Sequence, residues 1–587
     1  MQKFLSFFVL LFLVFGTQAQ QKPNVVIILA DDLDDMVTPQ FFPEVLPVLD
    51  SLKQNGIDFT NSFTPMSICC PSRAALLSGK YGHKTEVMRN GNTKGGWKYF
   101  KDDEPAALPA QLVKAGYRTA MIGKYLNGYK KKKSKPLPLP YGWTDGAVMV
   151  SAPMPIYRGY NYDLLIWDKA AKLNDTAWVA PYAQIEKHGK QEEDYSTDVL
   201  TKKAVAFIES AEQHDAQPFF LYLTPTPPHF PLPAAPRHEQ KASKRWLNTP
   251  MPQTPNYFND YGKLATEKEK EKPLDKSLWL TSNWKKRLRQ QDKGRFYYNL
   301  AFTGKLPKEI KSFMQATWYY RMASLYALND MMEQVIATLK AEGEWDNTLL
   351  IFTSDNGFHL GSKGLYHKGS PYEEAIRVPL VIAGGDSLHL NIAGKSEEWI
   401  VNLDLMPTLL ELAGVDIPSD VDGKSIVPLL NKNAAANHQS RESFIMEYIS
   451  PGGTDFIFGG PKLNIKLFPS PLLDRPSYNA IRMITDIEVD GIATKKTFKY
   501  IEWEKYYGMK KFRNKLENKD PQLLAKIAAG NKHATKKKEK AEAVETELYN
   551  ITDDPYEMDN LLYYQPERYK QLTKQMQARL YTEIGKL

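Results

Sequence analysis

Five short apolar segments, set among longer segments of helical periodicity, constrain the fold of this chain more than any other feature of its sequence. The apolar segments are Val25–Leu29, Thr119–Ile122, Phe219–Leu223, Leu349–Phe352 and Leu380–Ile382. The segments in which apolar residues recur at helical spacing are Phe42–Gln54, Ala107–Ala115, Thr197–Ala211 and Phe313–Ala341. Strands that alternate with helices along a chain pair into a mostly parallel sheet, which the helices cover. The pattern therefore predicts an α/β fold built on a large, mostly parallel sheet.

The last quarter of the chain has a different texture. Tyr478–Val489 and Lys495–Glu502 are typical of a hairpin pair, and Pro566–Lys586 is typical of an amphipathic helix. The length of the chain, 587 residues, suits one large domain and one smaller domain. We therefore expect a main α/β domain over residues 20–435 and a smaller α+β domain over residues 436–587.

The first residues predict export. Lys3 precedes the apolar run Phe4–Phe15, and the small residues Thr17 and Ala19 follow it. This order describes a secretory signal peptide over residues 1–19, cut after Ala19; the alternative is an uncleaved anchor. The apolar run is too short to span a bilayer, so we expect no integral membrane segment in the mature protein. The expected location is secreted or periplasmic.

The net charge of +8 is partly clustered. The clusters are Lys130–Lys133 with Lys135, and Lys536–Lys538 within the charged segment Lys532–Glu545. Such runs are typical of solvated loops, and they would also suit an anionic polymer. A charged, proline-rich stretch over residues 237–300 predicts an insertion over the rim of the sheet. No zinc finger or basic zipper is present, so we expect no nucleic-acid partner.

Polar residues follow four of the five predicted strands. Asp31-Asp32 comes after the first, Lys124 after the second, His229 after the third and Asp355-Asn356-Gly357 after the fourth. The carboxyl ends of strands in an open parallel sheet line the ligand crevice. Asp-Asn-Gly is also a common turn sequence, and alone it would indicate a turn. Four polar clusters at one end of one sheet instead indicate a binding site.

Four of these residues form a candidate metal site. Asp31, Asp32, Asp355 and Asn356 offer three carboxylates and one amide oxygen. All-oxygen donors suit a hard cation, Ca²⁺ first and Mg²⁺ second, and zinc is disfavoured because no His/Cys set accompanies them. The alternative for Asp31 and Asp32 is a pair of helix-capping acids.

The only two cysteines, Cys69 and Cys70, are neighbours in the chain. A trans peptide points adjacent Cβ atoms apart, and a bridge between neighbours would close no useful loop. Two alternatives remain open on composition: a chemical role for at least one of them, or a buried pair of small apolar residues. We expect the helix that follows to begin at Pro71, which would put Cys69 just before a helix N-terminus.

A helix N-terminus favours an anion, because its N–H groups are unpaired and its dipole end is positive. Arg73 in the first turn can donate two hydrogen bonds to a tetrahedral oxyanion, and Lys124, Lys368 and His229 add further donors. A metal and several cations around one nucleophile predict a site that hydrolyses an anionic ester, mainly by stabilising charge.

These residues carry a resemblance to a known family. Cys69-Cys70-Pro71-Ser72-Arg73, followed by Leu77-Ser78-Gly79, resembles the type I sulfatase signature Cys-x-Pro-x-Arg…Thr/Ser-Gly. The further similar segments are Gly116–Lys124, Asp355–Lys368 with Tyr372–Leu380, and Leu548–Leu561. The resemblance runs from about Pro23 to the end of the chain, with four motifs in the family's order.

The resemblance implies an alkaline-phosphatase-like sandwich with a smaller C-terminal domain. It also implies that a separate formylglycine-generating enzyme, which reads Pro71 and Arg73, oxidises Cys69 to Cα-formylglycine (3-oxoalanine). Cys70 occupies the signature's variable position. The aldehyde hydrates; one hydroxyl attacks sulfur, the sugar alcohol leaves, and the second hydroxyl expels sulfate and regenerates the aldehyde.

The roles implied by the resemblance carry over by position. Asp31, Asp32, Asp355 and Asn356 would hold Ca²⁺, with the modified Cys69 also in its coordination shell. Arg73 would orient the nucleophile, and Lys124, His229 and Lys368 would bind sulfate. His229 or Lys368 would also protonate the leaving oxygen.

One departure from the family pattern affects the regeneration of the aldehyde. Many sulfatases continue Gly-Lys-Trp-His-Leu-Gly, and that histidine assists regeneration; here the run is Gly123-Lys124-Tyr125-Leu126-Asn127. His83 or His359 could replace it, and each is equally open to a structural role. The same run, with Cys-Cys-Pro-Ser-Arg and Phe358-His359, resembles N-acetylglucosamine-6-sulfatases and bacterial polysaccharide sulfatases.

The resemblance implies a sulfated carbohydrate as substrate: a glycosaminoglycan, mucin, or an algal polysaccharide such as ulvan or carrageenan. Two other functions stay open. A phosphodiesterase or phosphonate monoester hydrolase of the same superfold would share the metal acids. A non-catalytic secreted binder of sulfated glycans would keep Cys69 unmodified.

Overall fold

The computed structural model describes most of the chain. Its described residues are 22–91, 95–130, 137–151, 153–174, 177–212, 217–247, 249–256, 308–363, 365–385, 388, 394–430, 439–449, 477–489, 492–503 and 545–585. The signal peptide predicted over residues 1–19 lies outside them. So do most of the predicted insertion and the lysine clusters, apart from the exposed Lys130.

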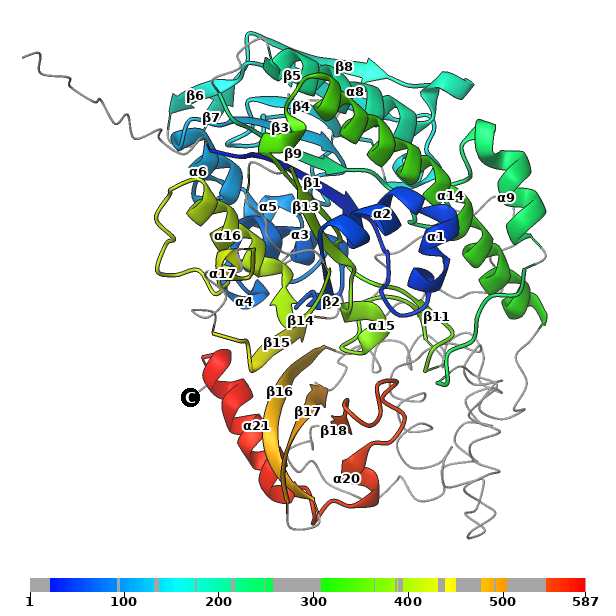
Figure 1. The fold of residues 1–587 in the computed structure, drawn as a ribbon, viewed down its shortest axis with the longest axis vertical. Coiled ribbons are helices and arrows are strands. Elements are labelled where there is room, and N and C mark those ends of the chain that lie inside the picture. The colour runs from blue at the N-terminus through cyan, green and yellow to red at the C-terminus, as the bar shows by residue number, and fades with distance from the viewer. Residues whose placement is uncertain are drawn as a thin grey trace, which may run out of the picture.

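The main sheet has ten strands, and the predicted α/β class is confirmed (Figure 1). Across the sheet the strands are β14 (Gly394–Val401), β2 (Ile57–Phe63), β13 (Leu380–Gly384), β10 (Thr348–Ser354), β1 (Asn24–Ala30), β9 (Phe219–Thr224), β3 (Arg118–Gly123), β4 (Asp145–Met149), β5 (Asp163–Asp168) and β8 (Tyr182–Lys187). The central run from β10 to β4 is parallel. All five apolar segments of the sequence are strands of this sheet.

One of those five strands runs in the direction opposite to the one expected. β13 pairs with β10 in an antiparallel register. The chain leaves β10 at its carboxyl end, stays at that edge through residues 355–379 and enters β13 from there. Because no crossover helix carries the chain back to the other edge, the strand must point the other way.

Helices cover both faces of the sheet, because alternate side chains of each buried strand point to opposite faces. Val26 and Ile28 of β1 pack under α2 (Pro47–Asn55), α8 (Ser196–Glu212) and α14 (Lys308–Ala341). Val25 and Ile27 pack under α3 (Cys69–Ser78), α6 (Leu108–Lys114) and α16 (Leu405–Leu412). The helix expected over residues 42–54 is divided into α1 (Phe42–Val45) and α2, because Pro47 lacks the N–H that would continue α1 and instead opens α2.

A second, antiparallel sheet lies against the first. Its strands are β15 (Ser443–Tyr448), β16 (Tyr478–Val489), β17 (Ile492–Trp503) and β18 (Glu545–Asn550), and α21 (Lys570–Glu583) packs on it. Figure 1 shows this unit below the main sheet. One continuous apolar cluster includes Phe63 and Tyr372 from the main sheet's side together with Phe444 and Ile481 from the second sheet. The two sheets therefore share a core.

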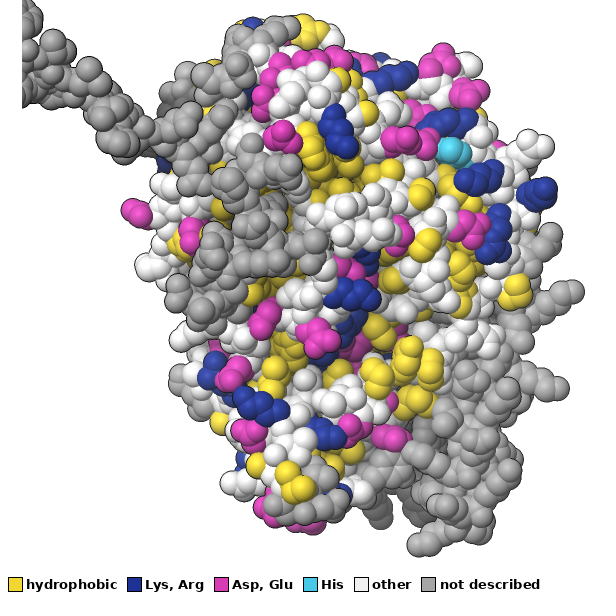
Figure 2. Space-filling model, in the orientation of Figure 1, with side chains coloured by type: hydrophobic (Ala, Val, Ile, Leu, Met, Phe, Trp, Pro, Cys, Tyr) yellow, Lys and Arg dark blue, Asp and Glu magenta, His cyan; other side chains and the backbone are white. Residues whose placement is uncertain are grey.

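On the face shown in Figure 2, basic and acidic side chains are interspersed rather than gathered into one basic band. None of the helices in the described part of the chain has the length and hydrophobicity that a bilayer-spanning segment needs.

Candidate functional site

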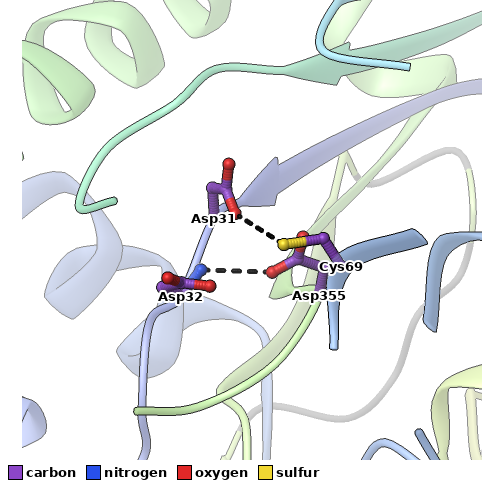
Figure 3. A group of neighbouring side chains, drawn as sticks. All are labelled: Asp31, Asp32, Cys69 and Asp355. Atoms are coloured by element: carbon purple, nitrogen blue, oxygen red, sulfur yellow. Dashed lines mark hydrogen bonds between the residues drawn. The ribbon is translucent and has the colours of Figure 1, made fainter. Parts of the chain in front are cut away.

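The carboxyl ends of β1 and β10 bring the predicted acids together. The two strands are parallel neighbours, with Ala30 opposite Ser354. Asp31 follows one strand and Asp355 the other, and Asp355 N donates to Ala30 O at 3.1 Å. Asp32 N donates to Asp355 Oδ1 at 3.1 Å (Figure 3). Residues more than three hundred positions apart in the chain thus become neighbours at one sheet edge.

A left-handed turn at Asp32 explains how two consecutive acids can serve one site. In an extended strand their side chains would point to opposite faces. Asp32 has a φ of 70°, a conformation that Asp tolerates better than most residues. The chain therefore turns after Asp31, and both carboxylates lie in the group that Figure 3 draws.

The donor set fits a hard cation. One donor atom each from Asp31, Asp32, Asp355 and Cys69 lies within 4.8 Å of the others, and all four residues are buried. Asn356 donates from Nδ2 to Asp32 Oδ1 at 2.8 Å. Among the described residues, neither Asn356 Oδ1 nor Asp32 Oδ2 has a hydrogen-bond partner. Buried oxygens are rarely left without a partner, so two such atoms beside three carboxylates indicate a place for a divalent ion.

Cys69 is the first residue of α3. The helix begins two residues earlier than expected from Pro71, with Ile68 extended as its N-cap, and ends at Gly79 in the left-handed conformation. The N–H of Cys70, in the first turn, donates to Asn90 Oδ1 at 2.9 Å. Asn90 was not anticipated, since nothing in its sequence context marks it as a neighbour of the helix terminus.

The two cysteines are both free and buried but lie in different surroundings. Cys69 Sγ lies 3.6 Å from Asp31 Oδ1 and 2.7 Å from Lys368 Nζ. Cys70 lies in the apolar core between α3 and the sheet. Burial raises the pKa of Cys69 to about 12, despite the nearby ammonium groups of Lys124 and Lys368. The thiol is therefore protonated near neutral pH, and an unmodified Cys69 would be a poor nucleophile.

Three predicted cations surround the acids. Arg73 Nε donates to Asp355 Oδ2 at 2.9 Å, and Arg73 Nη1 donates to the carbonyl oxygen of Lys124 at 2.5 Å. Lys124 Nζ donates to Asp31 Oδ2 at 2.6 Å, and Lys368 Nζ donates to Asp32 Oδ1. All three cations are at least nine-tenths buried. Arg73 Nη2 has no hydrogen-bond partner in the described part of the chain, which leaves a buried donor for an anion.

Charge pairing fixes the ionisation of the site. Burial would raise the pKa of Asp31 and Asp32, but the surrounding cationic groups together, led by Lys124 for the first and Lys368 for the second, lower both pKa values. The pKa of Lys368 is raised in turn: burial opposes its charge, but Asp32 and the neighbouring acidic groups together outweigh burial. The acids are therefore ionised and the lysines charged near neutral pH.

His229 lies at the same edge and is held by a tyrosine that the sequence did not suggest. Its Nδ1 lies 2.7 Å from Phe230 O, so Nδ1 carries the hydrogen, and its Nε2 lies 3.6 Å from Asp32 Oδ2. Tyr157 stacks on the imidazole with ring centroids 3.6 Å apart, and Lys124 Nζ lies 5.0 Å from the Tyr157 ring centroid. Burial lowers the pKa of His229 to about 4, with Asp32 opposing, so the ring is neutral.

A sequence signal for Tyr157 did exist. Tyr157 lies in α7 (Pro153–Arg158), which follows the carboxyl end of β4. The same strand-end rule that selected Asp31, Lys124, His229 and Asp355 would have selected this segment, had β4 been recognised as a strand.

The two histidines considered as replacements for the missing family histidine have other partners. His83 Nδ1 lies 2.9 Å from Glu447 Oε1 of the second sheet. His359 has a serine hydroxyl at each ring nitrogen, Ser362 and Ser370, both at 2.6 Å. These contacts favour structural roles for both histidines.

The matching family model and two of the most similar curated relatives are named as sulfatases. A family model described as Sulfatase matches residues 23–415. The chain is 31% identical over 453 residues to human N-acetylglucosamine-6-sulfatase, covering 75% of this chain and 70% of that protein. It is 30% identical over 435 residues to the extracellular sulfatase SULF-1 homolog of Drosophila melanogaster, covering 73% of this chain but only 33% of that protein.

Two solved structures show the shared fold. One is of a protein in complex with its substrate D-glucosamine-2-N,6-O-disulfate, with a TM-score of 0.62 and 23% identity, covering 96% of this chain and 97% of that one. The other is the phosphonate monoester hydrolase of Agrobacterium radiobacter, with a TM-score of 0.54 and 17% identity, covering 96% of each chain. Because two chemistries share this fold, the fold alone does not select between them.

Proposed function

The chain belongs to the sulfatase family and is a sulfuric ester hydrolase; from this premise we propose that it removes sulfate from a sulfated glycan, with residue 69 as the nucleophile. The observation that carries the proposal is the convergence of three buried carboxylates and three buried cations on Cys69 at the N-terminus of α3. Hydrolysis of a sulfate ester needs cations beside the nucleophile, because they stabilise the sulfate oxygens while the nucleophile approaches sulfur.

Position 69 needs activation, because a buried thiol of raised pKa attacks poorly. The proposed activation is the conversion of Cys69 to Cα-formylglycine, whose hydrate supplies a hydroxyl nucleophile. Pro71 and Arg73 complete the Cys-x-Pro-x-Arg sequence that the maturation enzyme would read. Conversion would occur before folding is complete, since Cys69 is only 1% exposed in the folded chain.

Asp31, Asp32, Asp355 and Asn356 would hold a divalent cation, Ca²⁺ before Mg²⁺. When bound, that ion would polarise a sulfate oxygen and offset the charge of the three carboxylates. The fit rests on the two buried oxygens without hydrogen-bond partners, Asp32 Oδ2 and Asn356 Oδ1. Lys124 and Lys368 pair with Asp31 and Asp32, and with these acids bound to an ion the two lysines would donate to the substrate instead.

The remaining side chains of the site would bind the sulfate and protonate the leaving oxygen. Arg73 orients the group at position 69 through the helix turn that they share, and Lys124 binds a sulfate oxygen. Lys368 or His229 would protonate the leaving oxygen. The raised pKa of Lys368 keeps it charged, and its Nζ lies 2.7 Å from Sγ, so it also stabilises the anion beside residue 69. His229 is neutral before substrate binds, and a sulfate beside it would raise its pKa and make it a second donor.

The proposed substrate class is a sulfated amino sugar in a glycan. Support comes from relatives named for N-acetylglucosamine-6-sulfatase activity. Glycosaminoglycan and mucin are the sources that contain such sugars, and an algal polysaccharide such as ulvan, which lacks them, is the alternative substrate to compare. The predicted signal peptide and an extracellular relative support action outside the cytoplasm, secreted or periplasmic.

The deciding experiment combines mass spectrometry with a substrate panel. Protein made in its native host, or with a maturation enzyme, should lose about 18 Da at Cys69 relative to the thiol. The converted protein should release sulfate from 6-O-sulfated N-acetylglucosamine faster than it hydrolyses a phosphonate monoester. A free thiol with turnover intact would exclude the proposed nucleophile, and faster phosphonate cleavage would move the activity to the related hydrolase.

A further inference from the structure

The segment that carries Lys368 has no regular secondary structure to hold it. Lys368 lies between the two-residue strand β12 (Tyr366–His367) and the short helix α15 (Glu373–Ile376). Both of its neighbours have left-handed backbones, His367 with a φ of 80° and Gly369 with a φ of 82°. A single lysine in such a segment needs anchors from elsewhere if its Nζ is to stay in place.

The first anchor comes from the chain beside Cys69. Gly369 N donates to Ser67 O at 2.8 Å, and Ser67 Oγ donates to Ser370 O at 2.7 Å. The second sheet closes this side: Tyr478 OH lies 3.3 Å from Ser67 Oγ. A Cβ added at Gly369 would meet the Tyr448 ring of β15 at 3.3 Å, so the ring packs closely on the loop.

The second anchor is a fully buried lysine of β17. Lys499 Nζ donates to Pro371 O at 2.9 Å, three residues after Lys368. It also pairs with Glu373 Oε1 at 2.6 Å and with Glu557 Oε1 at 2.7 Å. Two carboxylates and one carbonyl fix this ammonium, and it is 0% exposed. A buried ammonium held by three partners has little freedom to move, because leaving its place would break two buried ion pairs and a hydrogen bond at once.

The partners of Lys499 are themselves tied to both units. Arg482 of β16 and Arg377 both pair with Glu373. Glu557 Oε2 accepts from the N–H of Glu373 at 2.9 Å. We use the name junction cluster for Glu373, Glu557, Arg377, Arg482 and Lys499. It joins the Lys368 segment to the second sheet by charge rather than by apolar contact alone.

We propose that Lys499 is a positioning residue for catalysis: through Pro371 O and Glu373 it holds the Lys368 segment so that Lys368 Nζ stays beside residue 69. The inference rests on the proposed function, because it takes Lys368 to act on the bound sulfate ester. It gives the second sheet a specific part in the reaction. A displacement of about 1 Å in a reacting group costs about a hundred-fold in rate.

A double-mutant cycle tests this role. With the converted enzyme and 6-O-sulfated N-acetylglucosamine, whose leaving alcohol needs a proton, Lys499→Met should lower kcat/KM by about ten- to a hundred-fold. In a Lys368→Met background the same change should have almost no further effect, because its route of action is gone. Lys499→Arg should recover part of the loss. Lys496→Met, on the same strand but paired with the surface residue Asp553, is the matched control and should retain wild-type kcat/KM.

Two outcomes overturn the inference: wild-type kcat/KM in Lys499→Met, or an equal loss in both backgrounds, which would mean a general structural effect. If Lys499→Met fails to fold, Lys499→Met with Glu557→Gln removes both charges of one pair and replaces it in the cycle. Wild-type kcat/KM in Lys368→Met alone would instead overturn the role of Lys368 in the proposed function. The two failures are therefore distinguishable.

Discussion

The site around Cys69 and the junction cluster use the same residue types for different ends. Both are buried groups of acids, arginines and lysines. In the junction cluster both carboxylate oxygens of Glu373 have cationic partners: Arg482 and Lys499 at Oε1, and Arg377 at Oε2. In the site, Asp32 Oδ2 and Asn356 Oδ1 have no hydrogen-bond partner within the described residues. Glu557 Oε1 and Arg482 Nε of the junction cluster also lack a hydrogen bond within the described residues, but Glu557 Oε1 still faces Lys499 Nζ at 2.7 Å. Among the described residues, Asp32 Oδ2 and Asn356 Oδ1 face no lysine or arginine at ion-pair distance, which leaves room for a ligand.

The difference shows what makes buried charge functional. Burial raises the pKa of a carboxyl, and the cations around Glu373 reverse this and hold its pKa far below the ordinary range. Such pairing makes an ion structural, because each charge already has its partners. The three acids of the site also have cationic partners, but Asp32 Oδ2 and Asn356 Oδ1 do not have a hydrogen-bond donor among the described residues, and a divalent ion would use them. Whether a cluster binds a ligand follows from the partners it lacks, not from its composition.

Removal of the nucleophile is the largest expected effect and concerns only the site around Cys69. Cys69→Ala should lower kcat by about four orders of magnitude or more, since the substitution deletes the only group able to form the covalent intermediate. The melting temperature should change little, because alanine fits the first turn of α3. Steady-state assay and thermal melting check this, and near-wild-type kcat would rule out residue 69 as nucleophile.

Removal of the metal should give the second-largest effect on activity, and only the site around Cys69 should respond to it. A chelator should lower kcat by about a hundred- to a thousand-fold, and Ca²⁺ should restore activity better than Mg²⁺. Added Ca²⁺ should raise the melting temperature of the wild type, and Asp355→Asn should abolish that shift. Glu373→Gln should leave the Ca²⁺-induced rise in melting temperature unchanged, because the Glu373 carboxylate pairs with cations of the protein and does not bind the metal. Full activity in metal-free protein would exclude the proposed ion.

Removing a charge from the junction cluster should lower the stability of the protein and leave metal binding unchanged. Glu373→Gln leaves Arg482 buried without its ion-pair partner and Lys499 with Glu557 alone, and it should lower the free energy of unfolding by about 3–5 kcal/mol. Glu567→Gln, whose partner Lys570 is exposed, is the control and should change it by less than about 1 kcal/mol. Denaturant unfolding measures both, and equal stabilities would show that the junction cluster is not structural.

The stacked tyrosine should give a smaller effect inside the site around Cys69. Tyr157→Leu removes the ring beneath His229 and Lys124 and should lower kcat/KM by about three- to ten-fold, while Tyr157→Phe keeps the ring and should stay near wild type. Kinetics of the two variants decide the point. A loss in the Phe variant as large as in the Leu variant would assign the role to the hydroxyl instead.

The smallest expected effect is a change in pH dependence at the edge of the junction cluster. Burial, with Glu557 adding repulsion, raises the pKa of Glu374 to about 7. The folded state therefore binds this proton more tightly than the unfolded state, whose pKa is near 4.5. Stability from this group is full below about pH 4.5 and is lost as the pH rises to about 7.

Glu374→Gln keeps the acceptor for Asn256 but cannot ionise. The wild type should therefore lose melting temperature relative to this variant between pH 5 and pH 8, by about 1–3 °C. Thermal melts across that range measure the difference. Parallel curves would mean that Glu374 titrates alike in both states.

The main sheet was predictable because its rules are local. A buried strand is a short apolar run, and the carboxyl ends of parallel strands meet at one edge. Asp31, Lys124, His229 and Asp355 could therefore be grouped from their positions after the strands alone. The helix start at Cys69 and the division at Pro47 differ from expectation by a few residues, as helix boundaries commonly do.

Contacts between distant segments could not be predicted in this way. Lys499 meets Pro371 and Glu557 across separate strands and loops, and no periodicity links those positions. Asn90 accepts a hydrogen bond from the first turn of α3, and this contact depends on how the two segments pack in three dimensions. The direction of β13 depended on a connection whose path the sequence does not specify.

By itself the sequence determined the fold class, the order of the chemistry-bearing residues and the family signature around Cys69, because each depends on short-range spacing. The tertiary structure decided which buried charges have partners in the protein and which oxygens are left for a ligand. It also decided that Tyr157 stacks on His229 and that the second sheet contacts the Lys368 segment. These are properties of groups brought together from remote parts of the chain. Their energies depend on burial and on the partners present, neither of which is written in any one stretch of residues.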